Sequence, residues 1–108
     1  MEELPNREAA FVEEEKLGYL FRGKNKGGYF LGLGFSEDTP EVLRDALLRH
    51  AREHGERGVV KVTATEHGIK YNLVGELLSP DGRNPQTRAI WQIDRDDWRP
   101  RLVTAYPV

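Results

Sequence analysis

The stretch Val60-Lys-Val-Thr-Ala-Thr-Glu-His-Gly-Ile-Lys-Tyr-Asn-Leu-Val-Gly-Glu-Leu77 decides the fold, because apolar and polar residues alternate along most of it. A period of two is typical of a strand with one buried face and one wet face. Glu66-His67-Gly68 interrupts the alternation and predicts a tight hairpin. We therefore expect two antiparallel strands joined at this turn.

The same alternation continues toward the C-terminus. Ser79-Pro-Asp-Gly82 predicts a type I turn, and residues 87–94 predict a third strand with Trp91 and Arg88 on opposite faces. A last strand is expected over residues 101–106. It would place three side chains on one face: Leu102, Thr104 and Tyr106.

The first half of the chain is expected to be helical. Residues 13–17 are good helix formers, and the glycine-rich stretch 27–35 fits a helix or a strand, of which we favour the helix. Pro40 and Gly55 mark the start and the stop of a helix over residues 40–54. The fold class is therefore α+β, with N-terminal helices packed on a four-stranded antiparallel β-meander, in one domain spanning residues 1–108.

Composition excludes several classes of protein. The 108 residues include no cysteine, which rules out disulfide scaffolds, thiol nucleophiles and thiolate metal sites. The chain shows no apolar run of membrane-spanning length, and its N-terminus is acidic rather than signal-like. We expect a cytoplasmic protein with no membrane partner and no cofactor. The net charge of −2 argues against broad nucleic-acid binding but leaves room for a local cationic site.

Several cations are candidates for such a site. Lys24 and Lys26 lie among glycines in a loop that either cradles a phosphate or is a solvated turn. Arg88 is expected in mid-strand, and on a sheet face under helices it would need an internal carboxylate or a bound phosphate as its partner. Lys24, Lys26 and Arg88 form the candidate phosphate-binding set, and Arg101 is also available to a local cationic site.

Two histidines lie on the apolar side of the predicted helix 40–54. His50-Ala-Arg-Glu-His54 matches the H-x-x-E-H string of some zinc peptidases, but a third ligand is not evident. We therefore predict no metal site, and we expect His50 to pack against the sheet with a hydrogen-bond partner. His54 is expected near the helix C-terminus, where the helix dipole favours a positive charge.

The sequence resembles an uncharacterised family of short bacterial domains known only as a domain of unknown function. The resemblance covers nearly the whole chain and departs from the family between Phe21 and Lys26, where members carry a longer loop with His-Pro. It is carried by several strings, of which the last is the most specific: Leu4-Pro-Asn-Arg-Glu-Ala-Ala-Phe-Val12, Lys16-Leu17, Tyr29-Phe30, Arg88-Ala-Ile-Trp91 and Pro100-Arg-Leu-Val-Thr-Ala-Tyr-Pro107.

The layout of that family is similar to the superfamily of metal-independent ribonuclease toxins that includes barnase, EndoU, colicin D and RelE. The resemblance implies a ribonuclease-toxin-like domain that acts on RNA, with a cognate inhibitor protein as a further partner. Cleavage would need cations for charge stabilisation, groups that orient the phosphate, and a base. The residues that fit these roles are Lys16, Lys26, His50, Arg88, Thr104 and Tyr106. The alternative is a non-catalytic protein-interaction module of the same fold.

Overall fold

The computed structural model describes residues 2–23 and 27–108, with helices in the first half and strands in the second. A 3₁₀ turn, η1 (Arg7–Ala9), precedes α1 (Glu14–Arg22), α2 (Gly27–Gly32) and α3 (Pro40–His54). The strands are β1 (Val59–Thr65), β2 (Gly68–Glu76), β3 (Gln86–Asp94) and β4 (Pro100–Pro107). The predicted α+β arrangement is confirmed, as is the helix over residues 40–54.

The four strands form one antiparallel sheet in the order β1-β2-β3-β4, which is the predicted meander. Thr65 pairs with Gly68 across the first hairpin, where the alternation of the sequence is interrupted. Gly68 adopts a φ of 152°, and a Cβ at this position would overlap the carbonyl oxygen of Ile93. The hairpin therefore requires glycine here.

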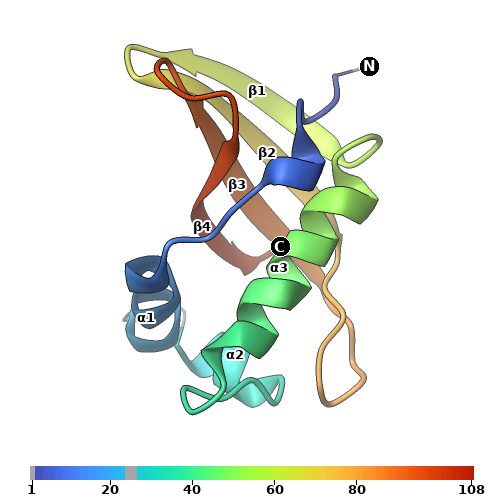
Figure 1. The fold of residues 1–108 in the computed structure, drawn as a ribbon. Coiled ribbons are helices and arrows are strands. Elements are labelled where there is room, and N and C mark those ends of the chain that lie inside the picture. Colours follow the sequence, from blue (N-terminus) through green and yellow to red (C-terminus); the bar gives the residue numbers. More distant parts are fainter. Residues whose placement is uncertain (1, 24–26) are drawn as a thin grey trace.

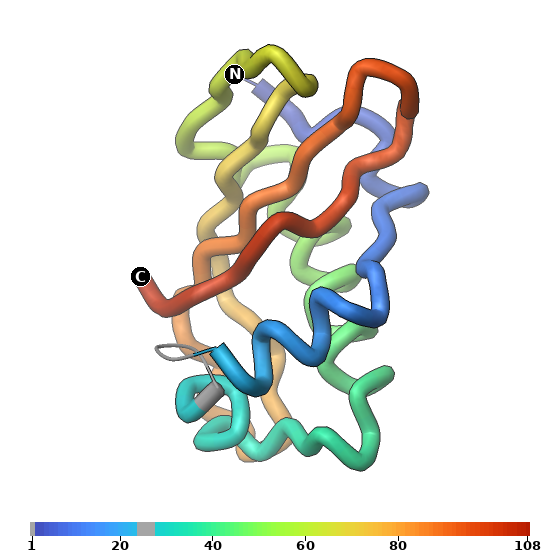
Figure 2. Tube along the Cα trace, turned by 90° about the vertical axis from the view of Figure 1, so that its left-hand side faces the viewer, coloured from blue at the N-terminus to red at the C-terminus, as the bar shows by residue number. Residues whose placement is uncertain are grey.

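The described helices lie on one face of the sheet. Figure 1 shows α3 crossing in front of the strands, with α1 and α2 near the lower end of the sheet. In the side view of Figure 2 the strands run through the left and upper parts of the molecule, and α3 lies toward the right. We call the two sides of the sheet the covered face and the open face. The part of the chain that the structure describes contains no helix long and apolar enough to cross a membrane.

The hydrophobic core lies between the covered face and the helices. Trp91 is fully buried at its centre, paired on one side with Tyr71 and on the other with Leu102. From the helical side, α3 contributes Leu43 and Leu47, both without exposed surface. The alternate residues of the strands therefore point away from this core, onto the open face.

The last strand departs from simple alternation. Ile90 pairs with Thr104 and Trp91 pairs with Leu102, so Val103 is an extra residue in β4. Such a bulge reverses the face of the residues that follow it. The prediction that Leu102, Thr104 and Tyr106 share one face is therefore wrong: Leu102 lies in the core, whereas Thr104 and Tyr106 lie on the open face.

The N-terminal segment crosses the covered face and borders one edge of the sheet. The amide of Leu4 donates to the carbonyl of Gly55 at 2.7 Å, and Phe11 forms a parallel bridge with Arg101 of β4. This bridge covers part of the β4 edge. The opposite edge is β1, which pairs only with β2 among the described strands.

Candidate functional site

The open face carries a cluster of polar side chains across β2, β3 and β4. Arg88 on β3 lies opposite Tyr106 on β4, and Ile90, two residues further along β3, lies opposite Thr104. Side chains at opposite and diagonal positions on one face are near neighbours. The register therefore brings together Arg88, Thr104 and Tyr106, three of the residues predicted to form the site.

Arg88 is held by a neutral partner. Its Nη1 donates a hydrogen bond to Oδ1 of Asn72, on the neighbouring strand β2, at 3.4 Å. Arg88 is half-buried and makes no ion pair with a described carboxylate. A guanidinium has five N–H donors and a permanent charge, so most of its donors remain for an anion. We call Asn72, Arg88, Thr104 and Tyr106 the open-face patch.

Two lysines extend the positive charge around this patch. Lys61 of β1 lies opposite Asn72, and Lys70 lies two residues from Asn72 along β2. The acid in the adjacent row is Glu76, which is exposed and lies diagonally from Arg88 without pairing with it. Three cations against this acid leave the region locally positive, although the whole chain is not.

Arg101 lies on the same open face but is neutralised. Its Nε and Nη2 donate to the two carboxylate oxygens of Asp94 at 3.0 and 3.1 Å, and its Nη1 lies 3.7 Å from Glu13. These hydrogen bonds hold the pKa of Asp94 below its usual value and raise the pKa of Arg101. The expectation that Arg101 is available for a phosphate is therefore wrong, because a fork of this kind already satisfies its guanidinium.

Arg88 does not lie on the sheet face under the helices. The residues of β3 on the covered face include Thr87, Ala89 and Trp91, all without exposed surface. Arg88 is the alternate residue and faces away from α3.

His50 lies on the covered face, across the sheet from the open-face patch. The residue is 1% exposed, and its Nε2 donates to the carbonyl oxygens of Gly75 and Thr87 at 3.1 and 3.0 Å. Burial, with His54 as a second cause, lowers the pKa of His50 to about 4. The structure therefore does not bring His50 together with Arg88, Thr104 and Tyr106, and gives it hydrogen bonds that hold α3 on the sheet.

The remaining predicted cations lie elsewhere or outside the description. Lys16 lies in the first turn of α1, with its Nζ 5.2 Å from the centre of the Tyr19 ring. This ring contact lies within α1 and does not involve the open-face patch. Lys24 and Lys26 lie outside the described residues.

The paired histidines of α3 contact each other and hydrogen-bond to the sheet. Their rings meet edge to face with centroids 4.6 Å apart, and Nε2 of His54 donates to the carbonyl oxygen of Glu76 at 3.0 Å. Glu53 pairs with Arg49 on the outer side of the helix. Residues 2–23 and 27–108 contain no group of three His, Asp or Glu side chains arranged to hold a metal.

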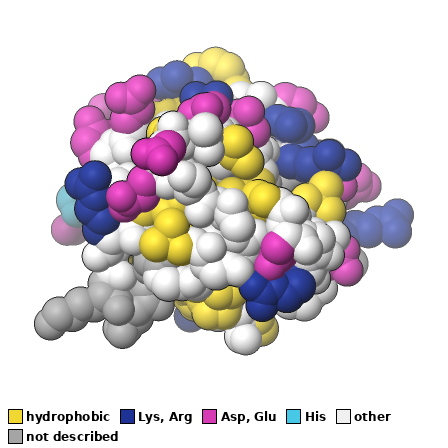
Figure 3. Space-filling view, turned by 90° about the horizontal axis from the view of Figure 1, so that it is seen from below, with side chains coloured by type: hydrophobic (Ala, Val, Ile, Leu, Met, Phe, Trp, Pro, Cys, Tyr) yellow, Lys and Arg dark blue, Asp and Glu magenta, His cyan; other side chains and the backbone are white. Residues whose placement is uncertain are grey.

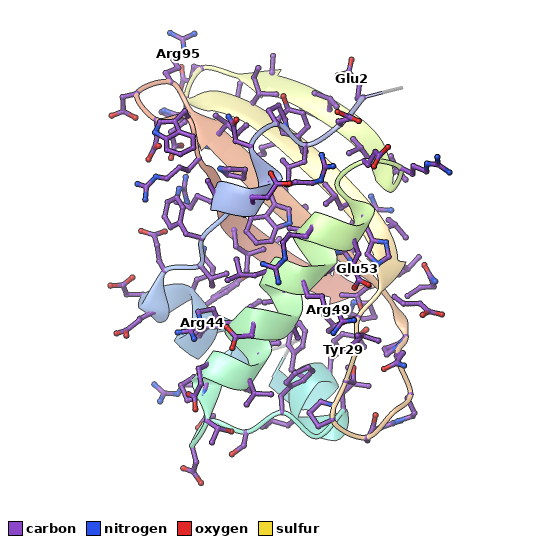
Figure 4. The ribbon with its side chains drawn as sticks, turned by 45° about the vertical axis from the view of Figure 1, so that its right-hand side comes forward. Glu2, Tyr29, Arg44, Arg49, Glu53 and Arg95 are labelled. Carbon is purple, nitrogen blue, oxygen red and sulfur yellow. The ribbon has the colours of Figure 1, made fainter. Side chains whose placement is uncertain are left out.

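The outer surface of the helices shows a different use of charge. Figure 4 shows Arg44, Arg49 and Glu53 on the side of α3 that points away from the sheet. Arg44 pairs with Asp45, and Arg49 with Glu53. Figure 3 shows acidic and basic side chains interspersed on the underside of the molecule. Acidic and basic side chains alternate on these surfaces, which is typical of a solvated face rather than of an anion site.

Asn72 is a residue of the patch that sequence reasoning missed. It is 9% exposed, although it lies on the face without a described helix. The available signal was the register, because an antiparallel pairing of residues 69–77 with residues 87–94 places Asn72 diagonally from Arg88. When the partner strand is ignored, a polar residue between Tyr71 and Leu73 indicates only a solvent-facing position on a strand.

Residues 3–108 match the profile of a family described as a domain of unknown function, DUF6883. Because the match spans nearly the whole chain, the chain belongs to this family, as the resemblance in sequence predicted. A comparison with curated proteins finds no similar sequence.

A solved structure with a similar fold is one chain of a "Contact-dependent growth inhibition toxin - immunity protein complex from Klebsiella pneumoniae 342". The TM-score is 0.76 at 17% sequence identity, and the alignment covers 91% of this chain and 99% of that chain. At this identity the likeness shows a shared fold. The α+β layout of the present chain is therefore found in a toxin–immunity system.

Proposed function

We propose that this member of the DUF6883 family is a toxin-like module that binds RNA on the open face of its sheet and cleaves it without a metal ion. The observation that carries the proposal is Arg88, a half-buried cation with a neutral partner and without a described carboxylate. A structural arginine at such a position is normally paired with an acid. An RNA phosphate has the negative charge and the pair of non-bridging oxygens that a planar guanidinium binds.

The groups of the patch fit two demands of RNA cleavage by the 2′-hydroxyl, which are charge stabilisation and orientation of the phosphate. In that reaction a bond forms between the 2′-oxygen and phosphorus, and the bond from phosphorus to the 5′-oxygen breaks. Water accepts the proton of the 2′-hydroxyl and supplies the proton that the 5′-oxygen gains, which leaves a 2′,3′-cyclic phosphate and a 5′-hydroxyl. Arg88 would stabilise the negative charge of the pentavalent phosphorane, while the hydroxyls of Thr104 and Tyr106 orient the phosphate.

The direct test is cleavage of RNA by the purified chain. Total RNA and transfer RNA are incubated with the protein in the presence of EDTA, and the products are analysed for 2′,3′-cyclic phosphate ends. We expect cleavage by the natural chain. Arg88→Ala should lower the rate by roughly a hundredfold, because it removes a charge that acts on the phosphorane.

The matched control is Arg52→Ala, an exposed arginine of α3 on the helical side of the molecule. It changes the net charge by the same amount and should leave the rate within about twofold, since it is remote from the open face. Equal rates for the natural chain and Arg88→Ala, or an absence of cleavage and of RNA binding with both, would overturn the proposal.

A second candidate function is supported by the exposed edge of the sheet. Val60 and Val62 of β1 are 57% and 38% exposed, and Ile69 of the next strand is 40% exposed. Apolar side chains on an unpaired edge strand are suited to receiving a strand from another protein. In this case the chain is an interaction module, and its partner is a cognate protein of a toxin–immunity pair.

These two functions differ in what each variant changes. Growth arrest on expression in a bacterial host, relieved by Arg88→Ala, supports the RNA-directed module. Growth that is unaffected by expression, with partner binding lost in Val62→Glu and kept in Arg88→Ala, supports the interaction module instead.

A further inference from the structure

We infer that Asn72 is a positioning residue of the open-face patch, and that its neutral amide leaves the charge of Arg88 available to an RNA phosphate. This inference rests on the proposed function, because it assigns a role toward the same ligand. The amide oxygen of Asn72 accepts from Nη1 of Arg88 at 3.4 Å and so fixes the position of the guanidinium. It does so without adding a negative charge.

The other half-buried arginines of the described chain each have a carboxylate as their partner. Arg7 lies 3.7 Å from a carboxylate oxygen of Glu56, and Arg101 has Asp94 as a bidentate partner. Arg88 has a similar class of exposure, yet its hydrogen-bond acceptor is an amide. Aspartate has the same length as asparagine and would form an ion pair with Arg88.

The choice of amide over carboxylate therefore points to a requirement other than folding. A carboxylate at residue 72 would attract the guanidinium and repel any phosphate that approached it. With an amide, the field at the patch stays positive, and Lys61 and Lys70 on the same face add to it. Asn72 thus combines two properties that a ligand site needs, which are a fixed geometry and an uncompensated charge.

The experiment measures binding apart from cleavage. A fully 2′-O-methylated RNA oligonucleotide is titrated with the natural chain, Asn72→Asp, Asn72→Ala, Arg88→Gln and the double variant Asn72→Asp with Arg88→Gln. This oligonucleotide has no free 2′-hydroxyl and is not cleaved by the proposed reaction. Binding is followed by fluorescence anisotropy, and thermal unfolding of each variant is recorded beside it.

We expect Asn72→Asp to weaken binding by roughly tenfold while the unfolding temperature stays the same or rises. Asn72→Ala keeps the charge of Arg88 but releases its position, so a smaller loss of about threefold is expected. In the Arg88→Gln background, Asn72→Asp should have little further effect, because the charge that it neutralises is already absent.

Different results overturn different statements. If Arg88→Gln weakens binding and Asn72→Asp does not, the role of Asn72 is wrong and the proposed function stands. Asn72→Asp that weakens binding equally with and without Arg88 also contradicts the inference, since its effect would then be general repulsion. If Arg88→Gln binds RNA as well as the natural chain, the proposed function itself fails at this site.

Discussion

The two faces of the sheet treat ionisable groups in opposite ways. On the covered face, His50 is buried and hydrogen-bonded to backbone carbonyls, and its lowered pKa keeps it neutral at pH 7. On the open face, Arg88 keeps its charge beside a neutral amide. The polar group on the covered face therefore attaches α3 to the sheet, whereas the open face retains a charge that the fold does not neutralise.

This difference separates stability from ligand chemistry within one sheet. Gly75 and Thr87 face α3, and the residues next to each of them in the chain face the opposite way. A change on one face is thus expected to alter the free energy of unfolding, while a change one residue away alters binding. This separation of stability from binding is testable, because a variant on one face of the sheet can be compared with a control variant on the other face.

The largest expected effect is the loss of stability in acid. Below pH 6.5 the unfolded chain protonates His50, whereas the folded chain resists protonation until about pH 4 because burial lowers this pKa. Stability should therefore fall as the pH drops, by roughly 2.5 kcal/mol between pH 7 and pH 4.5. Urea unfolding at a series of pH values measures this change.

The control distinguishes His50 from the other titrating groups. His67 is exposed in the first hairpin, so His67→Gln should keep the pH dependence, whereas His50→Gln should flatten it. The carboxylates with lowered pKa values, among them Asp94 and Asp97, lose their contribution at lower pH than this window. If the pH dependence of the free energy of unfolding is unchanged in His50→Gln, protonation of His50 is not the cause of the loss of stability in acid.

Gly75→Ala tests how closely α3 is attached to the sheet. A Cβ at Gly75 would overlap the imidazole ring of His54, so the ring must move from its hydrogen bond with Glu76. We expect a loss of about 2 kcal/mol in the free energy of unfolding. Val74→Ala, on the open face beside it, should cost less than about 1 kcal/mol. Equal losses in chemical denaturation would mean that the two faces do not differ in this respect.

The covered face was largely predictable from the sequence, because burial imposes periodicity. The alternation around Tyr71 and Trp91 and the capping residues Pro40 and Gly55 fix the strands and the long helix, since apolar side chains must share a side. His50 was expected to pack against the sheet on the same grounds, and it does.

The open face was less predictable, because nothing in a local pattern reveals a strand's partners. The extra residue Val103 reverses the face of Thr104 and Tyr106 relative to Leu102, and a bulge of this kind leaves no periodic signal. Asn72 became visible only through its contact with Arg88, and Arg101 gained a carboxylate from β3 that lies seven residues earlier in the chain.

The smallest expected effect comes from making Arg101 resemble Arg88. Asp94→Asn replaces the bidentate carboxylate with an amide, so Arg101 loses its main counter-charge while Glu13 remains 3.7 Å away. We expect a loss of about 1 kcal/mol in stability, since the pair is only partly buried, and a gain of about threefold in RNA affinity. Asp97→Asn is the control, because Asp97 pairs with Arg99 in the loop before β4. This variant removes the same negative charge, but at a position away from the patch. If both variants raised the affinity equally, net charge rather than the open face would govern binding, and the contrast between Arg88 and Arg101 would lose its functional meaning.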